Sequence, residues 1–369
     1  MTPAERPRET MYVTVGLNGG GAERLLTNLV LQAPDRDLIS VVSLYPGGEF
    51  RPALEDGGIR VTDLGMTRNR HALRGLFELA SLIRERRPSV VYGWQYHANV
   101  LAMLALMLAG QPRTPLFWGL FCTDICRGGF HPIFRLVRRI SGLLSRWTTA
   151  VIYNAEEARD FHRQLWYRER KSIVISNCVD RDVFQPAPQH RGSLREELGI
   201  PAGAIVVVIA ARVHPMKDWD NMREAVRDLP NVITIAIGKD TDGLPPQRNF
   251  IALGWRADVV RILSAADIFL LGSAYGEGTS LALEEAMHCG LACIVTDVGG
   301  NAALAEGAGI VVKPEQPALI REAIVQLAND PARREELGRA ARHVTAAAES
   351  RDETLQRLRI LTMQHEAQS

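Results

Sequence analysis

The sequence has few cysteines, few lysines and no long apolar run, and each shortage excludes a class of protein. Five cysteines in 369 residues do not make the framework of a small disulfide-linked domain, so we expect reduced thiols of a cytoplasmic protein. Two cysteine pairs have C-x3-C spacing, without histidines at zinc-finger distances, and we expect no structural metal site. The longest apolar run, residues 100–109, is too short to span a bilayer.

The charges of the chain are balanced, with 43 basic and 42 acidic side chains. A net charge of +1 does not favour nucleic acid as a partner, because nucleic-acid binding depends on many basic side chains. The basic side chains are 39 arginines and 4 lysines, which we attribute to coding bias. The first ten residues are polar, so we expect no signal peptide and predict a cytoplasmic protein.

Short β-branched runs alternate with amphipathic helical patterns along the whole chain. The strand-like runs are 11–17, 39–45, 90–94, 115–119, 150–153, 172–175, 204–211, 232–237, 250–253, 267–271, 292–296 and 310–312. The helical patterns between them include 22–32, 73–86, 98–108, 217–228 and 317–329. This alternation predicts an α/β protein with parallel sheets covered by helices on both faces.

A break in this pattern lies near residues 185–203, where prolines and a glycine precede a new series of strands. We therefore predict two doubly wound, Rossmann-like domains, 1–186 and 187–350, that face each other across a cleft. Residues 351–369 form a terminal helix in this prediction. Because open α/β sheets bind ligands at the carboxyl ends of their strands, the residues after each strand are the first candidates for a site.

The segment GLNGGGAE at 16–23 follows a strand and opens a helix. Glycine lets the backbone turn tightly and approach a ligand at Gly20 and Gly21, and a helix start offers N–H groups to a phosphate. The segment is neither G-x-G-x-x-G nor a P-loop. A tight turn without a ligand is the alternative.

Arg212 and Lys217 follow the strand at 204–211. Two cations at a strand end suit a diphosphate that gains charge as a bond breaks. The alternative is a pair of solvated surface charges, as most arginines and lysines are.

The segment SAYGEGTSLALEEAM at 273–287 gives the most specific signal. Its helix start, capped by a hydroxyl side chain, would present to an anion the N–H groups of Gly278, Thr279, Ser280 and Leu281. Glu277 before the helix and Glu285 within it can accept hydrogen bonds from vicinal hydroxyls. The segment predicts a phosphate site flanked by polyol-binding carboxylates. In the alternative, the acids only favour a solvated helix start, and we assign Glu284 to that group.

Two further segments carry weaker signals. The segment TDVGGN at 296–301 would add N–H groups at the same sheet edge, or be a simple turn. The stretch 134–147 is basic and amphipathic, and no acid occurs between Asp124 and Glu156. Such a helix can contact the inner face of an anionic membrane. A domain helix with one solvated face is the alternative that we favour, because Gly142 weakens a helix.

These segments together resemble the retaining GT-B glycosyltransferases of the family 4 type, in the same order over nearly the whole chain. The first half contributes GGGAER at 19–24, YHAN at 96–99, WG at 118–119, ISNCVD at 175–180 and FQP at 184–186. The second half contributes Arg212, Lys217 with Asp218, and the motif from Glu277 to Glu285 followed by Ala-Met.

The resemblance implies a GT-B fold whose terminal helix returns to the first domain. It implies transfer of a hexose or N-acetylhexosamine, with retained configuration, from a nucleotide sugar that is UDP-linked by family frequency. The acceptor would be a hydroxyl of a glycan, a lipid-linked sugar or a small natural product. The resemblance implies no cofactor and no metal. It leaves the acceptor and the oligomeric state open.

The resemblance also implies residue roles. Arg212 and Lys217 would stabilise the diphosphate leaving group, Glu277 would contact the donor sugar, and Glu285 would bind the ribose. Main-chain groups of Leu253 and Gly254 would bind the base. The full donor-binding set is Gly20, Gly21, Leu253, Gly254, Gly278, Thr279, Ser280, Leu281 and Glu285.

Cys122 departs from the family pattern, because related sequences often carry a histidine there, near the donor sugar and the acceptor. Either that role is lost or His97 contributes, so His97 is our further catalytic candidate, with a structural histidine as the alternative. A nucleotide-sugar-binding partner subunit without catalysis therefore stays open. A nicotinamide-dependent oxidoreductase is disfavoured without G-x-G-x-x-G. Loops around 66–72 and 122–132 are expected to select the acceptor.

Overall fold

The computed structural model describes residues 9–67, 71–128, 132–169, 171–175 and 177–366. Contacts divide the chain into two compact units. The first unit comprises Met1–Phe121, Phe130–Cys178 and Ser350–Ser369, and the second comprises Cys122–Gly129 and Val179–Glu349. The main boundary thus falls slightly before the predicted one at 186/187, and the short segment Cys122–Gly129 belongs to the second unit.

The described residues of the first unit form a seven-stranded parallel sheet in the order β3-β2-β1-β4-β5-β6-β7. Its strands are β1 Thr10–Thr14, β2 Ile39–Ser43, β3 Arg60–Asp63, β4 Val90–Trp94, β5 Leu116–Leu120, β6 Ala150–Tyr153 and β7 Ser172–Val174. Its helices are α1 Gly21–Leu31, α2 Arg51–Asp56, α3 Ala72–Arg86, α4 Tyr96–Leu108, α5 Pro132–Leu144, α6 Glu156–Gln164 and α14 Arg351–Glu366.

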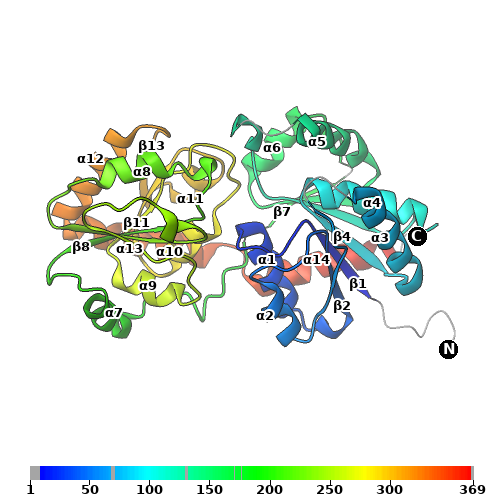
Figure 1. Cartoon of the computed structure of the whole chain (residues 1–369), viewed down its shortest axis with the longest axis horizontal. Coiled ribbons are helices and arrows are strands. Elements are labelled where there is room, and N and C mark those ends of the chain that lie inside the picture. Colours follow the sequence, from blue (N-terminus) through cyan, green and yellow to red (C-terminus); the bar gives the residue numbers. More distant parts are fainter. Residues whose placement is uncertain (1–8, 68–70, 129–131, 170, 176, 367–369) are drawn as a thin grey trace. The chain divides into compact units, whose positions relative to one another are not determined.

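The helices of this unit lie on both faces of the sheet (Figure 1). Leu25 of α1, Leu54 of α2 and Leu358 of α14 pack in one core cluster with alternate strand residues such as Tyr92 and Phe117. The helices α3, α4, α5 and α6 cover the other face (Figure 1). The predicted return of the terminal helix to the first domain is confirmed, because Leu358 is only 5% exposed in this core.

The second unit has a six-stranded parallel sheet in the order β10-β9-β8-β11-β12-β13. Its strands are β8 Ile205–Ala210, β9 Val232–Ile237, β10 Phe250–Ala252, β11 Ile268–Leu271, β12 Ala292–Thr296 and β13 Gly309–Val312. Its helices are α7 Arg191–Glu197, α8 Trp219–Val226, α9 Val259–Ala265, α10 Leu281–His288, α11 Asn301–Ala305, α12 Pro317–Asn329 and α13 Pro331–Ala347.

Alternate residues of each strand in the second unit face two separate cores, as the period of two in a strand requires. In β11, Phe269 and Leu271 pack with α9 and α10, whereas Ile268 and Leu270 pack with α8 and α12. The predicted fold class, α/β with two doubly wound sheets, is confirmed. In the described part of the chain, no helix is both long and apolar enough to cross a membrane.

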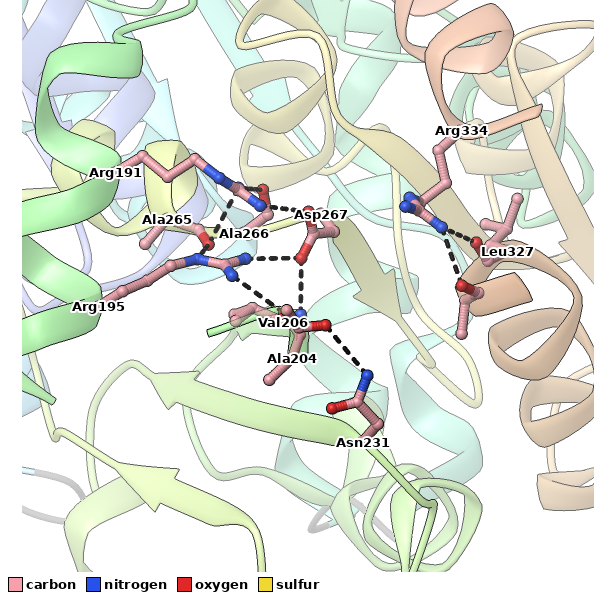
Figure 2. Close-up of polar contacts among 12 residues, drawn as sticks. Arg191, Arg195, Ala204, Val206, Asn231, Ala265, Ala266, Asp267, Leu327 and Arg334 are labelled. Carbon is pink, nitrogen blue, oxygen red and sulfur yellow. Dashed lines mark hydrogen bonds and ion pairs between the residues drawn. The ribbon is translucent and has the colours of Figure 1, made fainter. Parts of the chain in front are cut away.

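A hydrogen-bond network around one aspartate joins two strands at the amino-terminal edge of the second sheet (Figure 2). Asp267, directly before β11, accepts hydrogen bonds from Arg191 at 2.6 Å and Arg195 at 2.7 Å. The same carboxylate accepts from the N–H group of Val206 in β8 at 2.8 Å. Both arginines also donate to the carbonyl of Ala265 at the end of α9. The network therefore ties α7, α9, β8 and β11 together.

A fully buried histidine, His162 of α6, contacts α4 in the first unit. Nδ1 of His162 lies 2.6 Å from the carbonyl of Ala158, so it carries the proton, and Nε2 accepts from the hydroxyl of Tyr96 at 2.7 Å. Burial is the main reason why the pKa of His162 falls from the ordinary 6.5 to about 4. The folded unit therefore requires a neutral ring.

We expect this histidine to make the protein acid-sensitive. The unfolded chain binds a proton at His162 below about pH 6.5 and the folded chain only near pH 4, so stability falls as pH drops through that window. The loss between pH 7.5 and 4.5 is about 2–3 kcal/mol from this residue. Urea unfolding at the two pH values measures it. His162→Gln should reduce the pH dependence, whereas His343→Gln, at an exposed position, should leave it unchanged; equal slopes in all three proteins would refute the assignment.

Candidate functional site

The candidate site of the second unit lies where its strand order reverses. The chain runs from β8 outward to β9 and β10, and then returns to β11 on the other side of β8. Crevices at such switch points are where open α/β sheets bind ligands. The loops that follow β8 and β11 flank this point, and they carry Arg212, Lys217 and Glu277.

Lys217 and Glu277 are brought together across the switch point. Nζ of Lys217 forms an ion pair and hydrogen bond with Oε1 of Glu277. The hydroxyl of Ser273 donates to the same oxygen at 2.6 Å, and the carbonyl of Ser273 accepts from the hydroxyl of Thr296 at 2.6 Å. Glu277 is only 6% exposed. A buried carboxylate held by a cation and a fixed hydroxyl has a defined orientation.

Two glycines allow the backbone around Glu277 to pack closely. Gly276 has φ of +81°, and a Cβ there would lie 2.7 Å from Sδ of Met216. Gly299 has φ of +61°, and a Cβ there would lie 2.6 Å from the carbonyl oxygen of Gly278. Both positions need glycine for conformation and for space. The segment at 296–301 therefore packs directly against the loop before α10.

The N–H groups at this helix start are only partly available to an anion. The N–H of Ser280 donates to the side chain of Asn301 at 2.8 Å, and that of Gly300 donates to the carbonyl of Gly278 at 2.9 Å. In this structure the N–H groups of Ser280 and Gly300 are thus engaged within the protein, and the use of Ser280 for a ligand stays a prediction. Ser280 occupies the N-cap position of α10 but makes no side-chain capping bond. The N–H groups of Gly278, Thr279 and Leu281 stay candidates.

The two glutamates inside α10 are both buried. Glu285 is 1% exposed and Glu284 is 9% exposed. Our assignment of Glu284 to a solvated helix face is therefore wrong, because packing in the second unit encloses both sides of this short helix. Buried carboxylates are costly unless they are hydrogen-bonded or paired. Glu284 and Glu285 therefore each need an interaction partner.

Arg212, the second cation, lies on the same loop as Lys217 but is more exposed to solvent. Arg212 is exposed, and its carbonyl accepts from the indole N–H of Trp219 at 2.9 Å. Burial, followed by the charges of Arg212 and Lys217, lowers the pKa of the intervening His214. His214 accepts the N–H of Met216 at 3.2 Å through Nδ1, which fits a neutral ring. The loop therefore concentrates positive charge after β8.

Leu253 and Gly254 follow β10, where the sequence predicted contacts to a base. The N–H of Leu253 donates to the carbonyl of Ala236 at 2.9 Å, and the carbonyl of Gly254 accepts from the N–H of Gly238 at 2.9 Å. These two groups are engaged in the sheet edge. Only the other main-chain groups of the pair, the Leu253 carbonyl and the Gly254 N–H, stay candidates for a ligand.

Sequence reasoning missed the contact of the segment Cys122–Gly129 with the loop of Glu277. Cys122 pairs with Glu277 in an antiparallel bridge, and the N–H of Thr123 donates to the carbonyl of Gly276 at 3.2 Å. Arg127 forms an ion pair with Glu315 at 2.6 Å. Cys122 is 7% exposed, so its thiol is buried. No local pattern signalled this contact, because its partners are far away in the sequence.

In the first unit, the switch point lies between β1 and β4. The loop after β1 ends at Gly20, and the turn after β4 leads through Gln95 to His97. Gly20 has φ of −100°, so it does not need glycine for its conformation. Instead, the carboxylate of Glu23 lies where a Cβ of Gly20 would be, whereas Gly21 has open space around it. Gly20 therefore needs glycine for space and not for its backbone conformation, and the close approach of a ligand to Gly20 and Gly21 stays a prediction.

His97 lies in the first turn of α4, after the left-handed residue Gln95 with φ of +77°. Its ring is 5.6 Å from the ring of Phe134, and it is half-buried. Burial lowers the pKa of His97, so the ring is neutral near pH 7. A neutral imidazole at a strand end can accept or donate a hydrogen bond to a hydroxyl.

Two family models match the chain in consecutive regions. "Glycosyltransferase Family 4" matches residues 19–183, and "Glycosyl transferases group 1" matches residues 190–344. The candidate residues of each unit lie inside the matched regions.

Relatives and solved structures agree with these matches. An Escherichia coli UDP-Gal:alpha-D-GlcNAc-diphosphoundecaprenol alpha-1,3-galactosyltransferase is 27% identical over 62% of this chain and 63% of its own length. A Campylobacter jejuni N,N'-diacetylbacillosaminyl-diphospho-undecaprenol alpha-1,3-N-acetylgalactosaminyltransferase is 26% identical over 70% of this chain and 73% of its own. The crystal structure of Anabaena HepE in complex with UDP-glucose superposes with a TM-score of 0.81 at 21% identity, over 98% and 99% of the two chains.

Proposed function

The chain belongs to the family 4 type of GT-B glycosyltransferases, and from this we propose that it moves a hexose or N-acetylhexosamine from a UDP-linked donor to an acceptor hydroxyl. The acceptor is a glycan, a lipid-linked sugar or a small natural product. The observation that carries the proposal is the Lys217–Glu277 pair beside the first turn of α10, at the switch point of the second sheet. It combines a cation for phosphate with a carboxylate for sugar hydroxyls.

The donor would be held by the loops after β8 and β11. Arg212 and Lys217 face the diphosphate in this proposal, and the N–H groups at the start of α10 add to the positive potential. Glu277 exchanges part of its contact with Lys217 for hydroxyls of the sugar. Glu285 accepts from the ribose hydroxyls. The name of the E. coli relative, which specifies UDP-Gal, and the UDP-glucose bound to HepE support a UDP-linked donor.

The reaction would break the bond between C1 of the sugar and the diphosphate oxygen, which leaves with the electron pair as UDP. The acceptor oxygen forms the new bond to C1 on the same face, and its proton passes to the departing diphosphate. Arg212 and Lys217 stabilise the charge that develops on the leaving group. In this proposal no metal and no cofactor takes part, because the two cations and the helix start supply the positive charge.

Retention is supported by the relatives. The names of both relatives specify an alpha bond in the product, which is what same-face transfer gives from an alpha-linked nucleotide sugar. On the acceptor side, neutral His97 would orient the hydroxyl that attacks. We propose a cytoplasmic location, where four buried free cysteines would stay reduced.

Cys122 favours one alternative, a nucleotide-sugar-binding subunit without catalysis. Its buried thiol offers only a weak hydrogen-bond donor beside Glu277, where the family resemblance implies a histidine. The alternative predicts donor binding without turnover. The retained Lys217–Glu277 pair supports the enzyme instead.

Mass spectrometry of the reaction products tests the proposal. The chain is incubated with UDP-glucose, UDP-galactose and their N-acetyl analogues, each with a polyprenyl-diphosphate sugar, a free glycan or an inositol acceptor. We expect consumption of one donor and a product heavier by one sugar residue, with and without EDTA. Binding without consumption in every combination would support the non-catalytic subunit. Absence of both binding and consumption would refute the donor site.

A further inference from the structure

The helix α5 of the first unit is built with its apolar side outward. The outer stripe, which we define as Ile133, Leu136, Ile140 and Leu143 of α5 together with Trp147 of the 3₁₀ turn that follows, is between 36% and 62% exposed. The spacing of these residues by three and four places them on one helical face. An ordinary surface helix turns such a face toward the core, so this orientation requires a reason.

The inward side of α5 and of the turn after it is small and polar. Ser141 accepts the hydroxyl of Tyr167 at 2.8 Å, and Ser145 accepts the N–H of Arg168 at 2.8 Å. A Cβ on Gly142 would lie 2.6 Å from the carbonyl of Leu165, so the glycine lets the helix pack closely on this loop. These contacts fix which side faces inward. Gly142 thus allows the helix to pack closely on this loop, a role that the sequence analysis, which considered only its low helix propensity, did not predict.

Positive charge borders the outer stripe. Arg135, Arg139 and Arg146 are exposed, and the guanidinium of Arg146 lies 5.0 Å from the ring of Trp147. On the neighbouring helix α6, Glu156 and Asp160 are paired with Arg159. The stripe and its border therefore present apolar and cationic groups together.

The adjacent helix α4 also exposes apolar side chains. It packs against α5 through the ring contact of Tyr96 with Phe134 at 5.4 Å. Along its thirteen residues, α4 has no arginine, lysine, aspartate or glutamate. Its exposed side chains include Met107 at 62% and Leu108 at 45%. Isolated exposed apolar residues are common, but a gathered set such as the outer stripe of α5 indicates a binding surface.

We propose that the outer stripe of α5, with its arginines, docks on the surface of an anionic phospholipid bilayer. Apolar side chains enter the headgroup boundary and the guanidinium groups contact lipid phosphates, as interfacial helices do. A second copy of this chain fits less well, because pairing two stripes would bring the arginines of both copies together. The docking is independent of sugar transfer, so it stands or falls separately from the proposed function.

Vesicle co-sedimentation of the full chain tests the docking. With phosphatidylglycerol–phosphatidylcholine vesicles at low salt we expect the protein in the pellet, and with phosphatidylcholine alone in the supernatant. Arg135→Gln/Arg139→Gln/Arg146→Gln should weaken binding on the order of a hundredfold, about fivefold for each charge. The matched control Arg339→Gln, a side chain 67% exposed in α13, should bind as the unaltered chain does.

A second variant separates insertion from simple charge attraction. Leu136→Asn/Ile140→Asn keeps every charge and changes only exposed side chains, so its melting temperature should not fall. We expect it to lose binding, and we expect brominated acyl chains to quench Trp147 in the parent protein but not in this variant. Unchanged binding of this variant, or a dimer without vesicles that the same substitutions dissociate, would overturn the proposal.

Discussion

Replacing Lys217 by alanine is expected to slow sugar transfer by about 10²–10³-fold, the usual effect of losing one preorganised electrostatic group. Nζ of Lys217 contacts Glu277, and the proposed mechanism directs it to the diphosphate as charge develops. Because the group acts on the leaving group in the transition state, kcat should fall more than donor affinity. Steady-state kinetics and calorimetric titration with UDP measure the two quantities.

Three comparisons make this result interpretable. Lys217→Arg keeps the charge on a larger, planar group, and it should be intermediate in rate. Lys171→Ala is the matched control, because Lys171 is exposed and lies directly before β7, at the amino-terminal edge of the first sheet. Circular dichroism checks that the second unit stays folded without the ion pair. Full activity of a folded Lys217→Ala protein would remove Lys217 from the mechanism.

Replacing Asp267 by alanine is expected to lower the free energy of unfolding by about 3 kcal/mol or more. The substitution leaves Arg191, Arg195 and the N–H of Val206 without their shared acceptor. Breaking one side of a buried ion pair is costly because the remaining charges stay poorly solvated. The side chains of Asp267 and Arg195 are only 12% and 15% exposed, so this ion pair is nearly buried. Urea unfolding followed by circular dichroism measures the loss.

The position of this network separates stability from binding. Asp267 lies at the amino end of β11, whereas the loop of Glu277 follows the carboxyl end, so UDP affinity of the folded fraction should not change. The control Glu335→Ala breaks an ion pair whose side chains are 74% and 67% exposed. Such pairs contribute about 0–1 kcal/mol. If Asp267→Ala were no less stable than this control, the network would not hold the strands together.

The strands were predictable because most of them are buried on both faces. The segment IVVVIA of β8 is a continuous apolar run, as expected for a central parallel strand. The prediction missed β3, whose sequence RVTD is partly exposed at a sheet edge. An edge strand buries little, so its pattern is weak. Helices such as the one at 317–329 and the terminal helix could also be predicted, because helix formation depends on local sequence patterns.

In the candidate site, the sequence predicted which residues follow the strands but not how their main-chain groups are used. Strand ends bring Lys217 and Glu277 to one sheet edge by topology alone. The N–H of Ser280, by contrast, is occupied by Asn301 from the next loop. The burial of Glu284 and the bridge between Cys122 and Glu277 also depend on the packing of distant segments. Local patterns contain no information on such pairs.

The assignment of Cys122–Gly129 to the second unit and of Ser350–Ser369 to the first has a consequence for dissecting the molecule. A fragment that begins at Val179 would lack the residues that pair with Gly276 and Glu277. The complementary fragment would lack Leu358 in its core. Cutting the gene at a single position therefore leaves both products incomplete. Each unit thus contains a piece encoded beyond the other unit's main segment.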